Sequence, residues 1–253
     1  YILINLFNMN SIHPKITSSD GKSMVSSKEW NDWQWQLSNR ITKITELEKY
    51  INLTKLERKG ITSAGTSFRW AITPYYASLM DKSDPSCPLR IQQIPSIQEL
   101  LDKSGLPDPL SEKDNSPVDS IVHVYPDRVA FKITNVCPTY CRYCFRKRLF
   151  MDENDEVTTD VTAGLQYIED HPEVTNVLLT GGDPLLMSTR RLTEIFEALR
   201  AIPHVRIIRL GSKMPAFDPY RIINDTELQQ AFRTYSTAEQ RIYLKAHFAH
   251  PPE

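Results

Sequence analysis

The sequence is short of the features that mark fibrous, disulfide-rich or strongly charged proteins. Its 253 residues include only 4 cysteines and 8 glycines, and 30 Lys and Arg balance 31 Asp and Glu for a net charge of -1. These values exclude a disulfide-dense scaffold and a collagen-like chain. Without a basic excess, neither nucleic acid nor a membrane is expected as a partner. Apolar runs fall well short of the ~18 residues of a spanning helix, so we expect a soluble protein.

The start of the sequence carries its own expectation. It opens on Tyr1 with a short apolar run that lacks the basic flank and cleavage site of a signal peptide. Residues 1–25 are therefore expected to be a disordered lead. The lack of a targeting segment, together with the low cysteine count, predicts a cytoplasmic location.

Residues 26–120 are predicted to form a helical and wrapping region. Capping-box spacing at Ser26 and Glu29, and again at Thr54 and Glu57, marks two helix starts. Apolar residues at steps of three and four then predict one core-facing helix surface, formed by Trp30, Trp33, Leu37 and Ile41. Seven prolines between residues 70 and 120 predict a connector with one short helix, near Ile97 to Lys103.

Residues 121–253 are predicted to form an α/β core. Strand-length apolar runs alternate with helical periodicity, a pattern typical of parallel strands joined by crossovers. The expected strands are Val129–Thr134, Val177–Thr180, Val205–Leu210 and Arg241–His247. The expected helices hold Val161, Leu165 and Ile168 after an N-cap at Asp160, then Leu192 to Leu199, then Leu228 to Phe232.

The length of this core allows about four strand–helix units, whereas a complete eight-unit barrel takes about 250 residues. We therefore expect a partial (β/α) barrel with an open edge, and such an edge would favour association into a homo-oligomer. The chain looks cut short at its C-terminal end.

The most informative segment is Cys137-Pro-Thr-Tyr-Cys141-Arg-Tyr-Cys144, directly after a predicted strand. Three thiolates at this spacing suit a [4Fe-4S] cluster whose fourth iron has no protein ligand and is open to a small molecule. A zinc site would normally need a fourth ligand. A disulfide would leave an odd thiol. Cys87 lies fifty residues away, too far to complete a ferredoxin set, and is interpreted as an ordinary buried thiol.

Three strings in order resemble the lysine 2,3-aminomutase family of radical S-adenosylmethionine (SAM) enzymes. They are ITNVCPTYCRYCFRKRLF, LLTGGDPLLMS and IPHVRIIRLGSKMP, and the resemblance extends from WNDWQWQLSNRI to HFAHP. It implies a radical SAM amino-acid 2,3-aminomutase of the lysine or glutamate type, and the FRKRLF string is closer to the glutamate type. Such an enzyme moves an amino group between C2 and C3 by means of a 5'-deoxyadenosyl radical and a pyridoxal 5'-phosphate (PLP) aldimine.

The resemblance also implies roles for individual residues. Cys137, Cys141 and Cys144 would hold the cluster, whose open iron binds SAM. Residues implied for cofactor binding are Tyr143 near the adenine, Arg146 on the SAM carboxylate, Gly181, Gly182 and Asp183 around the SAM amino group, Ser212 and His247 at the same site, and Arg128 near PLP. For a lone Gly-Gly-Asp string, an ordinary strand-to-helix turn would be the simpler interpretation.

The resemblance implies further partners: a small-molecule amino-acid substrate and an external reductant such as flavodoxin or ferredoxin. The family lysine that bonds PLP lies downstream of the HFAHP string, so we expect the 253-residue chain to hold the cluster and SAM but not to run the mutase reaction alone. No catalytic residue is assigned. Two alternatives remain: a mutase of the elongation factor P type, acting on a protein-bound lysine, and a non-catalytic metal-binding remnant.

Overall fold

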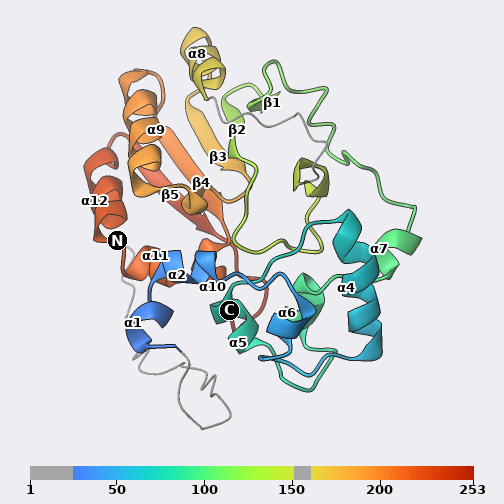
Figure 1. Cartoon of the computed structure of the whole chain (residues 1–253). Helices are drawn as coiled ribbons and strands as arrows, with labels where there is room; N and C mark the ends of the chain where they lie inside the picture. Colours follow the sequence, from blue (N-terminus) through green and yellow to red (C-terminus); the bar gives the residue numbers. More distant parts are fainter. Residues whose placement is uncertain (1–24, 151–160) are drawn as a thin grey trace.

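The computed structural model describes residues 25–150 and 161–253 of the chain (Figure 1). The predicted disordered lead therefore lies, except for Val25, outside the described residues, and so does Asp160, the predicted helix cap.

A five-stranded sheet forms the centre of the C-terminal half, in the strand order β1-β2-β3-β4-β5. The strands are β1 (Ile121–Tyr125), β2 (Arg128–Thr134), β3 (Asn176–Gly181), β4 (Ile207–Ser212) and β5 (Arg241–Ala246). Strands β2 to β5 are parallel, and β1 joins β2 antiparallel. The α/β expectation and its four strands are confirmed, whereas β1 was not predicted.

Three amphipathic helices lie along the sheet (Figure 1): α8 (Thr162–Asp170), α9 (Thr189–Ala201) and α12 (Thr226–Tyr235). Helix α9 buries the apolar stripe expected from the sequence, Leu192, Ile195, Phe196 and Leu199. Facing it, Phe131, Leu179 and Leu210 of the strands are completely buried. Burial of this stripe against the sheet stabilises this half of the chain.

The N-terminal region contains more and shorter helices than predicted. Both capping boxes are formed, at Ser26 with Glu29 and at Thr54 with Glu57. The single helix expected after the first box is wrong, because the Asp32 side chain accepts the Gln34 N–H and begins a second helix. The helices are α1 (Ser27–Trp30), α2 (Trp33–Ser38), α3 (Ile44–Leu47) and α4 (Lys55–Ser67).

The proline-rich stretch likewise holds three helices rather than one: α5 (Pro74–Leu79), α6 (Pro88–Gln93) and α7 (Gln98–Leu101). The first two begin on proline, which is favoured at the first helical position because its missing N–H has no partner there in any case. Short elements complete the core: η1 (Lys147–Phe150), η2 (Pro184–Leu186), α10 (Met214–Phe217) and α11 (Tyr220–Ile223).

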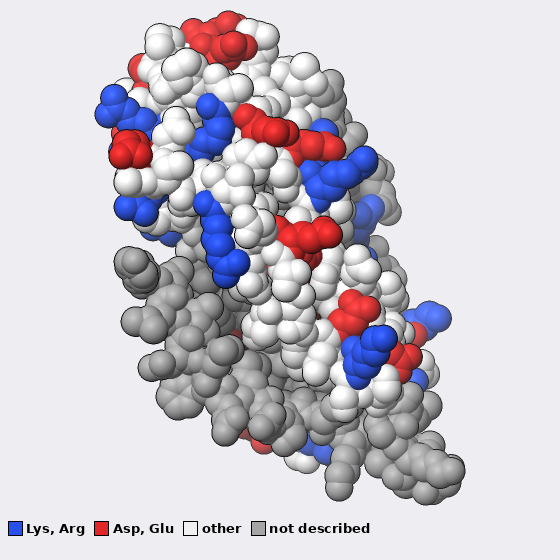
Figure 2. Space-filling view, turned by 90° about the vertical axis from the view of Figure 1, so that its left-hand side faces the viewer, with Lys and Arg blue, Asp and Glu red and all other residues white. Residues whose placement is uncertain are grey.

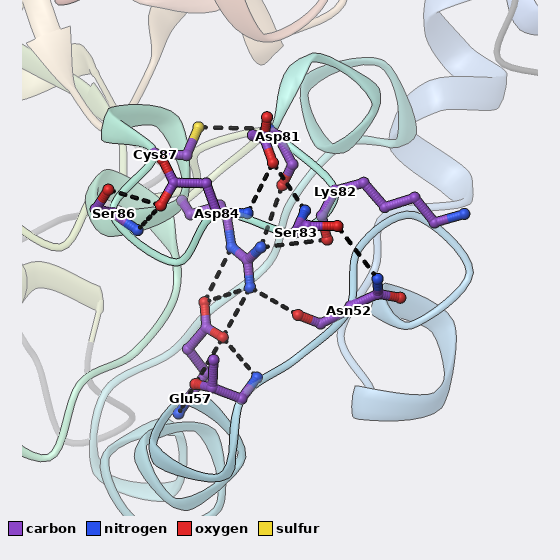
Figure 3. A network of polar contacts seen from close by, with 10 residues as sticks. Asn52, Glu57, Asp81, Lys82, Ser83, Asp84, Ser86 and Cys87 are labelled. Carbon is purple, nitrogen blue, oxygen red and sulfur yellow. Dashed lines mark hydrogen bonds and ion pairs between the residues drawn. The ribbon is translucent and has the colours of Figure 1, made fainter.

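A buried ion pair fixes α6 against α4 (Figure 3). Arg90, only 1% exposed, donates to both carboxylate oxygens of Glu57 at 2.7 Å. Its remaining donors reach the backbone carbonyls of Asn52, Asp81 and Lys82. Each nitrogen of the guanidinium therefore donates a hydrogen bond, as a buried charge requires.

The same network contains Cys87 (Figure 3). Its side chain is 8% exposed, belongs to an apolar cluster of the N-terminal helices, and accepts the N–H of Asp81 at 3.4 Å. The interpretation of Cys87 as an ordinary buried thiol is confirmed.

The outer face formed by α9 and α12 carries Lys and Arg interleaved with Asp and Glu (Figure 2). Within the described ranges, the structure contains no helix with both the length and the apolar character needed to cross a membrane.

Candidate active site

One cavity collects almost every residue that the sequence singled out. It has a volume of about 380 Å³ and lies at the carboxyl ends of the parallel strands, where α/β folds place their sites. Its lining includes Cys137, Cys141, Tyr143, Cys144, Arg146, Gly181, Gly182, Asp183, Ser212 and His247. Arg128 is not part of this lining.

The cysteine loop follows β2 and is held from the other side by the N-terminal region. Arg40 donates to the carbonyl of Cys137 at 2.9 Å, and the N–H of Arg142 donates to the carbonyl of Gln92 at 2.8 Å. The Arg142 guanidinium also forms an ion pair with Glu99 at 2.6 Å. The wrapping region therefore braces the cysteine loop from outside the cavity, whose lining begins at Cys137.

The three clustered cysteines are free thiols of intermediate exposure. Burial raises the pKa of Cys137, Cys141 and Cys144 above the ordinary thiol range. Thiols in such a place release their protons when a metal binds. Among the described residues, no three His, Cys, Asp or Glu side chains converge on a single metal ion. Cysteines that hold a cubane each bind a different iron and have no need to converge. The donor set therefore fits an iron–sulfur cluster.

Gly181 and Gly182 bring β3 directly against the start of the cysteine loop. Gly181 has a φ of +111°, and a Cβ there would lie 2.3 Å from the carbonyl oxygen of Thr134. A Cβ on Gly182 would lie 2.3 Å from the carbonyl oxygen of Val136. The Gly182 N–H donates to the carbonyl oxygen of Thr134 at 2.6 Å. The glycines thus allow backbone to approach backbone, and their predicted place around the SAM amino group stays a prediction.

Asp183 joins two strand ends beneath the cavity. Its carboxylate accepts four hydrogen bonds, from the Ser212 hydroxyl at 2.7 Å and from the N–H groups of Lys213, Met214 and Leu185 at 2.8 to 3.0 Å. Burial raises the pKa of Asp183, and these donors oppose that rise. The carboxylate fixes the end of β4. The predicted acceptance of an ammonium by Asp183 stays a prediction, as does ligand contact by Ser212.

Arg146 already has an anionic partner. Its guanidinium donates to both carboxylate oxygens of Glu112, at 2.7 to 3.1 Å, and to the hydroxyl of Thr180 at 2.8 Å. Burial favours a raised pKa for Glu112, but the bonds from Arg146 and Arg148 outweigh it and hold that pKa below its usual range. The pair places a charge-assisted, bidentate contact beside Cys144. Recognition of the SAM carboxylate by Arg146 stays a prediction.

The open side of the cavity presents aromatic and basic side chains. Tyr143 is 50% exposed, with its ring centroid 6.1 Å from that of His247. Lys213 lines the same cavity at 7% side-chain exposure, donates to the Tyr143 hydroxyl at 3.1 Å, and forms an ion pair with Glu253 at 2.7 Å. Lys213 is not among the residues predicted from the sequence, although its place directly after Ser212 at a strand end is a usable signal. No pattern in the sequence marks Glu112 as a residue of the site.

Arg128 lies at the first residue of β2, whereas the cysteine loop follows the last. Its guanidinium is paired with Asp127 at 2.7 Å, and the side chain is 45% exposed. The structure does not bring Arg128 to the cavity, so its PLP contact stays a prediction.

Comparison with known proteins agrees with this site. Residues 131–228 match the radical SAM superfamily. The chain is 44% identical over 231 residues to L-lysine 2,3-aminomutase of Fusobacterium nucleatum and 45% identical over 231 residues to that of Clostridium subterminale. It is 38% identical over 229 residues to glutamate 2,3-aminomutase of Clostridioides difficile.

These alignments cover 90% of this chain and 53 to 54% of the relatives, so the chain spans about half the length of the relatives it matches. The superfamily match contains the cysteine loop, the glycine pair and Asp183. Such a family implies a [4Fe-4S] cluster, SAM and PLP as cofactors. The chain therefore contains a radical SAM domain and is similar, over most of its length, to lysine and glutamate 2,3-aminomutases.

Proposed function

We propose that this chain provides the SAM-binding core of an amino-acid 2,3-aminomutase acting on lysine or glutamate. The observation that carries the proposal is the convergence of three free thiols, a glycine pair and a basic wall on one cavity at the strand ends. The identity of 38 to 45% with aminomutases supports the reaction class.

Cys137, Cys141 and Cys144 would hold the cluster in this proposal. When bound, the cluster and SAM supply the carbon radical that starts hydrogen-atom abstraction. The protein's own residues would bind and orient these cofactors and exclude water from the cavity. Tyr143 offers an apolar ring at the cavity mouth, and Asp183 keeps the end of β4 in place.

The basic residues of the cavity suit the anionic end of an amino acid. Lys213 and Lys245 both line it, and Arg146 lies beside Cys144. Because Arg146 and Lys213 are paired with Glu112 and Glu253, a substrate carboxylate would form charge-assisted hydrogen bonds with them by replacing one of these partners. Both candidate substrates carry an α-carboxylate, so this wall supports the class of substrate and does not discriminate within it.

The test is anaerobic reconstitution of the chain with iron and sulfide. We expect about four irons and four sulfides per chain, and an EPR signal of the reduced cluster that changes when SAM is added. Replacement Cys144→Ser should abolish the cluster, whereas Cys87→Ser, outside the cavity, should keep it. Stoichiometric zinc in place of iron would contradict the proposal and favour a non-catalytic metal-binding domain.

A further inference from the structure

A buried amide from the N-terminal region contacts one of the candidate cluster ligands. Gln93, the last residue of α6, is fully buried, and its Nε2 donates to the Sγ of Cys141 at 3.8 Å. The two residues are 48 positions apart in the sequence, so the contact exists only because the N-terminal region packs on the cysteine loop.

The environment of Cys141 differs from that of its two neighbours. The thiols of Cys137 and Cys144 lie close to backbone N–H groups, of Asp183 and Arg146 respectively. The polar groups that face Cys141 are instead the side chains of Gln93 and Tyr143, with the Lys213 ammonium nearby. A substitution can remove a side-chain donor, but it leaves a backbone N–H in place. Among the three cysteines, Cys141 is therefore the one whose hydrogen bonds depend on the identity of neighbouring side chains.

The backbone of α6, which carries Gln93, is held in place near both of its ends. The carbonyl of the adjacent Gln92 accepts the N–H of Arg142 at 2.8 Å, and its side-chain oxygen accepts the Lys213 ammonium at 2.9 Å. The other end of α6 is anchored by the Arg90–Glu57 pair. These contacts fix the backbone of α6, and the fully buried Gln93 side chain keeps its amide beside the sulfur.

We propose that Gln93 is a positioning residue that raises the reduction potential of the cluster through its hydrogen bond to the Cys141 sulfur. This inference rests on the proposed function. A cluster gains negative charge when it accepts one electron from an external low-potential donor, and a hydrogen-bond donor on a ligand sulfur stabilises that charge. The amide therefore favours the reduced state that SAM chemistry needs.

The test compares the reconstituted wild-type chain with Gln93→Leu, which removes the donor and keeps similar volume. Because the bond is stronger to the more negative sulfur of the reduced cluster, its loss should lower the ratio of reduced to oxidised cluster at a fixed applied potential by about threefold to tenfold. A tenfold fall corresponds to 59 mV for a one-electron couple. The matched control, Gln98→Leu, removes an exposed amide on α7 and should leave the ratio unchanged.

Unchanged potential in Gln93→Leu, with the cluster intact, would overturn the inference and leave the proposed function standing. Failure of the wild-type chain to hold any cluster would instead refute the proposed function itself. Should Gln93→Leu lose its fold by circular dichroism, Gln93→Met provides an unbranched side chain without a donor. If neither variant holds iron, the wild-type chain is measured by resonance Raman spectroscopy in H₂O and in D₂O. Fe–S stretching frequencies that do not shift in D₂O would show that no such hydrogen bond exists.

Discussion

Asp218 allows a stability prediction with a defined size. This carboxyl ends α10, is completely buried, and follows Phe217 of the cavity lining. Burial raises its pKa from 3.8 to about 7; the N–H of Tyr220 opposes the rise, Asp32 adds to it, and Arg221 opposes it. Tyr75, packed on the same site, has its own pKa raised by burial, by Tyr220 and by Asp218.

The sign of the pH effect follows from the raised pKa. Below about pH 4 both folded and unfolded chains hold the proton, and Asp218 costs nothing. Between about pH 4 and pH 7 the folded state keeps a proton that the unfolded chain releases, so stability falls as pH rises. The shift from 3.8 to about 7 is about 3 units at 1.36 kcal/mol each, or about 4 kcal/mol in all.

The perturbation is Asp218→Asn, and the measurement is urea unfolding at several pH values. The variant cannot ionise, so its stability relative to wild type should rise by about 4 kcal/mol between pH 4 and pH 8. Other titrating groups cancel in this difference. Asp119→Asn, at an exposed carboxylate, serves as the control for the loss of one negative charge. A stability difference for Asp218→Asn that does not change with pH would refute the reasoning.

Three further perturbations follow from the contacts. Gly182→Ala places a Cβ 2.3 Å from a carbonyl oxygen of the cysteine loop and should lower bound iron after reconstitution, whereas Gly105→Ala, with open space around it, should keep it. Glu57→Ala leaves the Arg90 guanidinium buried without its counter-charge and should cost about 3–5 kcal/mol in urea unfolding; equal stability would show that the pair is not buried as described. Asp183→Asn leaves a buried backbone N–H unpaired at a cost of about 1–3 kcal/mol, and a melting temperature equal to that of wild type would contradict its bracing role.

The parts of the molecule predicted from sequence are those set by neighbouring residues. The strand runs of the core and the α9 stripe carry their burial pattern in their own residues, and the structure buries them as expected. The Ser26 and Thr54 capping boxes are four-residue signals and are both present. The cysteine spacing is likewise local, so the ligand candidates were identified before their surroundings were known.

The parts that escaped prediction depend on distant contacts or on an ambiguous residue. Proline suggested interruption at Pro74 and Pro88, yet both positions begin a helix. Glu112 and Gln93 act on the cysteine loop across 34 and 48 positions, and no local pattern in the sequence encodes such a pairing. Arg128 was assigned by resemblance alone, and the structure places it at the opposite end of its strand.

The central claim is that three thiolates bind a four-iron cluster and leave one iron for SAM. Mössbauer spectroscopy of the ⁵⁷Fe-reconstituted chain tests this most directly, because it resolves individual iron sites. We predict that SAM changes the signal of one iron in four and leaves the other three in place. A spectrum that SAM does not alter, or one that shows four equivalent irons before and after, would contradict the account.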